Sequence, residues 1–223
     1  MTEILVVDDT PGMVELIERL LSDVGYSTLG AESGKEALEI LKIKSPDLIM
    51  LDVMMPRLDG WQILKLIRDQ PDLRKVPVAM LTVKKLTHET VMGSEIGELV
   101  DYIQKPFTKE SLLKRVNCLV QESEDIAAEK TLLREAALAE NIIDDFEKTM
   151  RAEKLHEKIL GILRRSLETM NSPDEASVLE KAIELQEQKM EWIKVRAWTL
   201  KNDIRNIYSL MDNSWIKNPE YLS

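Results

Sequence analysis

Four short apolar runs, each followed by a polar side chain, limit the folds open to this chain of 223 residues. Runs of this length between turn residues are typical of strands that are buried on both faces. Helix-like patterns separate them, and such alternation predicts βαβ units around a parallel sheet. The runs are Ile4–Val7, Leu48–Leu51, Val78–Leu81 and Val100–Ile103.

The segments between these runs complete an α/β pattern for residues 1–122. Tyr26–Gly30 predicts a fifth, short strand. Ser33 and Glu36 have the spacing of a capping box at the start of a helix that runs to about Ile43, and Thr108 is expected to cap the final helix. Further helices are expected at Pro11–Val24, at Gly60–Asp69 and, from a polar and glycine-interrupted pattern, at 84–97.

The polar residues at the strand ends predict a site. Asp8 and Asp9 follow the first run, while Asp52, Thr82 and Lys105 follow three others. Parallel strands end at the same edge of a sheet, where open α/β folds bind ligands. Taken alone, Asp52 would also fit a turn or capping role, but three carboxylates, a hydroxyl and an ammonium group at one edge favour a ligand-binding site.

The ordered set of motifs resembles the receiver domain of two-component response regulators. It covers about Thr2 to Glu122 and consists of Val-Val-Asp8-Asp9, Leu-Asp52-Val-Met-Met-Pro-x-x-Asp59-Gly, Leu-Thr82 and Asp-Tyr102-Ile-x-Lys105-Pro-Phe. The resemblance implies a flavodoxin-like, doubly wound five-stranded parallel sheet. It also implies phosphorylation by a sensor histidine kinase, and no enzymatic activity except on the domain's own phosphoryl group.

The resemblance assigns roles to individual residues. Asp52 would be the nucleophile that accepts the phosphoryl group as an acyl phosphate. Mg²⁺ would be held by Asp8, Asp9, Asp52 and the backbone carbonyl of Met54, and would offset the negative charge that meets at the site.

Three further residues complete the expected site. Lys105 would contact the phosphoryl oxygens, while Thr82 and Tyr102 would form the switch that reads phosphorylation. Val83 follows Thr82 where the family usually has a smaller residue. Beside Met54, Val83 is expected to narrow solvent access and slow the loss of the phosphoryl group.

Composition narrows the function classes. The net charge is −10 and divides evenly between residues 1–122 and 123–223, so broad affinity for nucleic acid or anionic membranes is not expected. Cys118 is the only cysteine, which excludes an internal disulfide, and its place on a helix predicts a buried side chain. There is no apolar run of membrane-spanning length and no signal peptide, so we expect a cytoplasmic protein.

Residues 123–223 are expected to form an all-α output and dimerisation domain. No Gly or Pro occurs between Phe107 and Leu160, so the last receiver helix is expected to continue into this tail. We predict two long antiparallel helices over about 124–212, a coiled-coil hairpin that turns at Asn171-Ser172. The apolar stripes lie at Leu132, Ala136, Ala139, Ile143, Phe146 and Met150, and from Ala176 to Met211.

Apolar side chains also lie off these stripes, and they favour a homodimeric four-helix bundle, packing against the receiver, or an exposed partner surface. They include Leu138, Leu160, Trp192 and Trp198. Our first hypothesis is therefore that phosphorylation acts through tail dimerisation or partner binding. A second hypothesis is a transcription regulator that contacts DNA through basic helix surfaces, although no helix-turn-helix pattern is present. A third is a phosphorelay through His156.

Overall fold

The computed structural model describes residues 1–83, 99, 101–168 and 172–210. The chain divides into two compact units, Met1–Glu124 and Asp125–Ser223. The helix predicted at 84–97 lies outside the described residues. Among the helices that are described, none is both long and apolar enough to cross a membrane.

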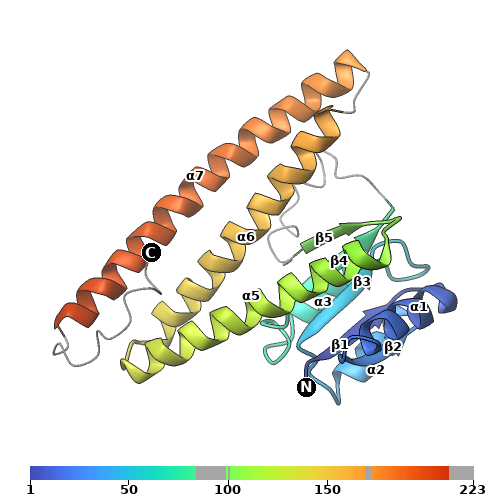
Figure 1. The fold of residues 1–223 in the computed structure, drawn as a ribbon, viewed down its shortest axis with the longest axis horizontal. Coiled ribbons are helices and arrows are strands. Elements are labelled where there is room, and N and C mark those ends of the chain that lie inside the picture. Colours follow the sequence, from blue (N-terminus) through green and yellow to red (C-terminus); the bar gives the residue numbers. More distant parts are fainter. Residues whose placement is uncertain (84–98, 100, 169–171, 211–223) are drawn as a thin grey trace. The chain divides into compact units, whose positions relative to one another are not determined.

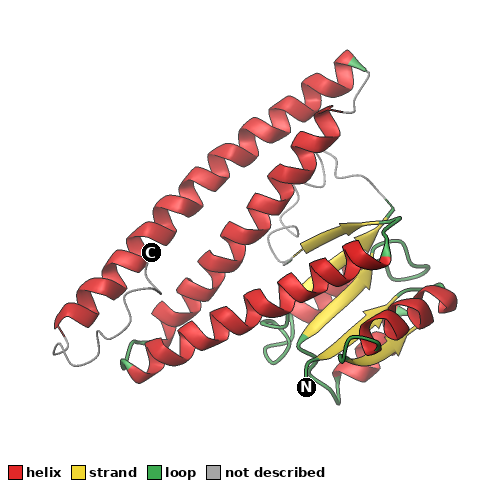
Figure 2. Cartoon of the chain, viewed as in Figure 1, coloured by secondary structure: helices red, strands yellow, loops and turns green. Residues whose placement is uncertain are grey.

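The first unit is built on the predicted five-stranded parallel sheet (Figures 1 and 2). Its strand order is β2-β1-β3-β4-β5, so the direction of winding reverses between β1 and β3. The register aligns Val7 with Leu51, and Asp52 with Leu81, which brings the strand ends level. The strands are β1 (Glu3–Val7), β2 (Ser27–Ala31), β3 (Leu48–Asp52), β4 (Val78–Thr82) and β5 (Asp101–Gln104).

Helices cover both faces of the sheet, as the apolar runs predicted. α1 (Pro11–Ser22) and α5 (Lys109–Glu135) pack on one face, where Ile17 and Leu112 join a core with Ile4, Met50 and Leu81. α2 (Gly34–Leu41) and α3 (Gly60–Arg68) complete the unit, and Gly34 lies against the Ile63 side chain. Apart from the end of α5, the predicted boundaries of the described strands and helices of this unit differ from these by only one or two residues.

The cap at the start of α5 was predicted correctly, but the burial of Cys118 was not. Thr108 Oγ1 accepts a hydrogen bond from the backbone N–H of Ser111, as predicted for a cap. Cys118 is exposed, so the prediction that it is buried was wrong. The buried stripe of α5 passes through Leu112, Val116 and Leu119, and Cys118 follows Val116 by about 200° of helical turn.

The second unit contains the predicted helical hairpin, formed by α6 (Glu140–Glu168) and α7 (Pro173–Leu210), which lie side by side and antiparallel (Figure 1). α7 begins at the predicted Pro173, whereas the expected turn at Asn171 lies outside the described residues. The predicted stripe of α7 is largely buried. Its buried members are Leu179, Gln186, Met190, Ala197, Leu200 and Ile204.

The prediction of one uninterrupted helix before the hairpin turn was wrong. α5 ends at Glu135, and α6 begins only at Glu140. Ala137 has a left-handed φ of 55°, and its N–H donates to the Arg134 carbonyl while the N–H of Leu138 donates to the Leu133 carbonyl. This pair of bonds is a Schellman motif, which satisfies the last carbonyls of a helix and reverses the chain.

This turn changes which tail residues are buried. Leu138 packs with Leu133, Phe146 and Ile204 in the core of the second unit, although it lies off the predicted stripe. Leu132 and Ala139 belong to that stripe but are exposed. The stripe depended on helical spacing across residues 136–139, where the chain is not helical.

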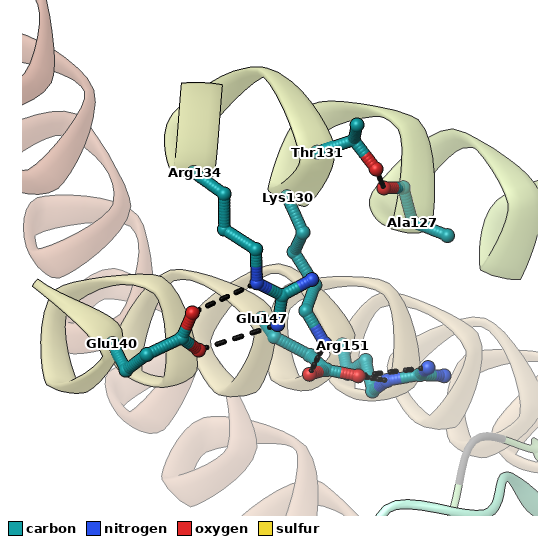
Figure 3. Close-up of polar contacts among 7 residues, drawn as sticks. All are labelled: Ala127, Lys130, Thr131, Arg134, Glu140, Glu147 and Arg151. Atoms are coloured by element: carbon teal, nitrogen blue, oxygen red, sulfur yellow. Dashed lines mark hydrogen bonds and ion pairs between the residues drawn. The ribbon is translucent and has the colours of Figure 1, made fainter. Parts of the chain in front are cut away.

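Ion pairs join α5 to α6 beyond the turn (Figure 3). Glu147 is buried and accepts hydrogen bonds from Lys130 of α5 and from Arg151, one turn further along α6. Nearer the turn, Arg134 Nε donates to Glu140 Oε1 at 2.8 Å, between two exposed side chains. The Lys130–Glu147 pair is therefore shielded from water, whereas the Arg134–Glu140 pair is exposed to it.

We expect Ala137→Gly to raise the free energy of unfolding of the second unit by about 0.5–1 kcal/mol. A left-handed φ costs a residue with a Cβ roughly 1–2 kcal/mol, part of which the greater freedom of glycine in the unfolded chain offsets. Urea unfolding followed by circular dichroism measures the change. Ala128→Gly, an exposed interior position of α5, is the matched control and should lower stability by about 1 kcal/mol. Equal destabilisation by both substitutions would contradict the described turn.

Candidate functional site

Two carboxylates and an ammonium group meet at the carboxyl edge of the sheet. Asp8 follows β1, Asp52 ends β3, and Lys105 follows β5. Lys105 Nζ lies 2.5 Å from Asp8 Oδ2 and 2.6 Å from Asp52 Oδ1, and donates a hydrogen bond to each. These three side chains are largely buried, with exposed fractions of 11% for Lys105, 2% for Asp8 and 6% for Asp52.

The loop after β3 holds Asp52 in place. Asp52 Oδ2 accepts a hydrogen bond of 2.7 Å from the backbone N–H of Met54. Gly60 lies directly against the Asp52 carbonyl, where a Cβ would collide with the backbone. Asp59 then begins α3 with a capping box to Gln62, which fixes the far end of the loop.

Lys105 is held by backbone contacts and by its charge partners. Its N–H donates to the Thr82 carbonyl at 2.6 Å, and the following bond to Pro106 is cis. Burial alone would lower the pKa of Lys105, but the hydrogen bonds and negative charges of Asp52 and Asp8 outweigh it and raise the pKa. Lys105 therefore keeps a positive charge at neutral pH.

Thr82 and Tyr102, the predicted switch residues, lie on neighbouring strands. Both are buried, with exposed fractions of 0% and 3%, and their side chains hydrogen-bond one another. Burial raises the pKa of Tyr102, and the bond to Thr82 lowers it by a smaller amount. Thr82 ends β4 beside the Asp52 strand, so the pair lies at the same edge as the carboxylates.

The other predicted residues border this cluster. Asp9 is exposed next to Asp8, and Met54 and Val83 are also exposed. In the described part of the chain, no group of three or more His, Cys, Asp or Glu side chains is close enough together to form a complete metal-binding set. The donors still fit Mg²⁺, which prefers oxygen ligands, keeps several waters and requires only one or two carboxylates.

One residue that the sequence patterns did not predict lies beside Tyr102. Arg115 of α5 donates hydrogen bonds to both carboxylate oxygens of Asp101, which is buried at the start of β5. Arg115 also donates to the Tyr102 carbonyl at 3.3 Å. Asp101 stands in a quoted motif, but no pattern in the sequence relates it to an arginine fourteen residues later.

His156, the third hypothesis, lies inside the hairpin of the second unit. It is 8% exposed and hydrogen-bonded to Gln186, which is fully buried on α7. Burial lowers the pKa of His156, with a further contribution from Lys189, while the bond to Gln186 opposes the shift. A phosphoryl donor would have to reach this ring through the packed helix pair.

Comparison with known proteins decides the family of the first unit. The response regulator receiver domain matches residues 4–117, just over half of the chain. This chain belongs to the response regulator receiver family. The five-stranded sheet and the fold class predicted from the sequence are thereby confirmed.

Several response regulators are similar to this chain. The alkaline phosphatase synthesis transcriptional regulatory protein PhoP of Bacillus subtilis is 36% identical over 145 residues, which cover 65% of this chain and 59% of that protein. The response regulator MprA of Mycolicibacterium vanbaalenii is 42% identical over 118 residues, covering 53% and 50%. The matched region therefore spans little more than half the length of these relatives.

A solved structure agrees with this assignment. The CheY-like response regulator receiver domain protein of Methanospirillum hungatei aligns with a TM-score of 0.51 and 30% identity, covering 56% of this chain and 98% of its own. The match thus extends over almost the whole of that receiver domain and about half of this chain.

Proposed function

We propose that this response regulator accepts a phosphoryl group from a sensor histidine kinase onto Asp52. The observation that carries the proposal is the buried cluster in which Lys105 bridges Asp8 and Asp52 at the carboxyl edge of a receiver sheet. A carboxylate oxygen of Asp52 would attack the phosphorus of a phosphohistidine. The new O–P bond would form as the P–N bond breaks, and the imidazole would leave.

Asp8, Asp9, Asp52 and the Met54 carbonyl are the groups that would hold Mg²⁺. The ion would supply positive charge against the phosphoryl oxygens and the neighbouring carboxylates. Lys105 would supply the second positive charge, because its raised pKa keeps it an ammonium. Its bond to Asp52 Oδ1 would then be exchanged for a bond to a phosphoryl oxygen.

Thr82 and Tyr102 would transmit the change. A phosphoryl oxygen on Asp52 offers Thr82 a charged acceptor, which competes with the neutral phenol of Tyr102. Displacing Tyr102 would alter the backbone that Arg115 contacts, and Arg115 belongs to α5. α5 is one helix from Lys109 to Glu135, so it carries the chain from the first unit into the second.

We propose that the second unit is the output and that it acts by homodimerisation or partner binding. Support comes from α7, where two tryptophans are exposed by 79% and 68% on a helix whose opposite side is buried. Exposed apolar groups of this size usually mark an interaction surface.

The DNA-binding alternative rests on the printed names of relatives, among them a transcriptional regulatory protein. The basic side chains of α7 give it little support. Arg196 pairs with Asp145, and Lys201 lies near the carboxylate of Glu129, so part of the positive charge is neutralised within the unit. The burial of His156 likewise favours a structural role over a phosphorelay.

Incubating the protein with acetyl phosphate tests the proposed function. We expect intact-protein mass spectrometry to show one added phosphoryl group, and a chelator to abolish the addition because the acceptor carboxylates need Mg²⁺. The bond should be labile to alkali, as an acyl phosphate is. An acid-labile, alkali-stable group would instead indicate a phosphohistidine, and equal uptake with and without chelator would contradict the metal requirement.

A further inference from the structure

The exposed side of α7 carries three apolar residues that no part of the described hairpin covers. Trp192, Val195 and Trp198 are exposed by 79%, 53% and 68%. At 3.6 residues per turn, Val195 points directly away from the buried stripe of α7, with one tryptophan on each flank. Burying this patch would remove two large aromatic surfaces from water, which is a substantial driving force for association.

The polar residues along this side are distributed unevenly about Val195. Glu184, Gln188 and Glu191 precede it, whereas Thr199 and Asn202 follow it. The first half also carries Lys181 at its far end but is acidic overall, whereas the second half carries neutral groups. With this charge distribution, the exposed side of α7 should pair more favourably with an antiparallel copy of itself than with a parallel copy.

The positions of these residues distinguish an antiparallel pair of α7 helices from a parallel pair. In an antiparallel pair centred on Val195, residues that are equally far from the centre lie at the same level. Glu191 then lies level with Thr199 of the second copy, Gln188 with its Asn202, and Trp192 with its Trp198. In a parallel pair every residue faces its own copy, which sets Glu184 and Glu191 against identical carboxylates at a cost in free energy.

We propose that the face formed by Trp192, Val195 and Trp198 is the homodimer interface, where α7 packs antiparallel against α7 of a second copy about a two-fold axis at Val195. Closed two-fold pairs are the commonest homo-oligomers, and their interfaces must be self-complementary in this way. The proposal rests on the proposed tail dimer and specifies its surface, orientation and register.

Sedimentation of the full-length protein tests the surface. Wild type should be a dimer at micromolar concentration, and Val195→Glu should weaken association by roughly 100-fold or more, because it places two carboxylates at the centre of an apolar contact. Lys194→Glu is the matched control, since it changes the neighbouring exposed residue to the same acid outside the face. It should remain dimeric. Trp192→Ser with Trp198→Ser removes the apolar surface without adding charge and should also give monomers with unchanged helix content.

Disulfide formation tests the orientation in a Cys118→Ser background, which removes the exposed native thiol. Gln188→Cys mixed with Asn202→Cys should give a cross-linked heterodimer, whereas Gln188→Cys alone should not cross-link. Cross-linking of Gln188→Cys with itself, without the heterodimer, would establish a parallel pair and overturn the proposed register.

The remaining outcomes separate this inference from the proposed function. A dimer that persists in Val195→Glu would reject this face while leaving tail dimerisation intact. A monomeric wild type would reject the dimer itself, and phosphorylation of Asp52 would stand or fall independently in the acetyl phosphate experiment.

Discussion

Asp52→Asn is expected to lower phosphoryl uptake on the order of 1,000-fold or more. The carboxamide has nearly the shape of the carboxylate and can still accept from the Met54 N–H, so the loop after β3 should keep its conformation. It is not a nucleophile, however, and it lacks the charge that pairs with Lys105 and that would attract Mg²⁺. Intact mass after incubation with acetyl phosphate and Mg²⁺ measures the loss.

Asp59→Asn is the matched control for this substitution. It makes the same chemical change seven residues later, where the Asp59 side chain caps α3 by accepting from the Gln62 N–H. Asparagine is an equally good capping residue, so both uptake and stability should stay near wild type. Uptake by Asp52→Asn at the wild-type level would place the acceptor elsewhere.

The second large effect concerns the buried ion pairs between α5 and α6. We expect Glu147→Ala to lower the free energy of unfolding of the second unit by about 3 kcal/mol. The substitution leaves Lys130, whose side chain is 13% exposed, without the carboxylate that offsets its burial. Glu140→Ala removes the exposed partner of Arg134 and should cost less than about 1 kcal/mol. Urea unfolding followed by helical circular dichroism compares the two substitutions.

The contribution of the Glu147 ion pairs to the free energy of unfolding should decrease as the pH falls. Burial raises the pKa of Glu147, but Lys130 and Arg151 outweigh it and lower the pKa below its ordinary value. A lowered pKa in the folded state stabilises the fold above the unfolded pKa, and the contribution disappears as pH falls through the folded value. The difference between wild type and Glu147→Ala should therefore shrink in acid. Equal effects of Glu147→Ala and Glu140→Ala at neutral pH would contradict the buried character of the Glu147 contacts.

The receiver fold could be predicted because several levels of its sequence agree. Each buried strand is an apolar run, each helix has a cap or an amphipathic stripe, and the strand ends carry the polar residues of the family motifs. The strand order and the contact of Lys105 with both Asp8 and Asp52 came from the structure. Their general location followed from the rule that parallel strands end at one edge.

The tail was predicted less well, and the reasons are physical. Helices that reverse direction usually do so at Gly, but here Ala137 takes the left-handed conformation, and the Leu133–Leu138 contact offsets its cost. Large apolar residues also occur on both the buried and the exposed side of α7. Leu200 is buried and Trp198 exposed although both are apolar, because burial depends on the partner helix as well as on spacing.

We propose that phosphorylation of Asp52 is read by Thr82 and reaches the helical tail. Hydrogen–deuterium exchange over α6 and α7 tests it most directly, with and without acetyl phosphate, in wild type and in Thr82→Ala. This route from Asp52 through Thr82 to the tail predicts that both proteins become phosphorylated, but that only wild type changes its exchange in these helices. Unchanged exchange in the phosphorylated wild type, or the same change in Thr82→Ala, would contradict it.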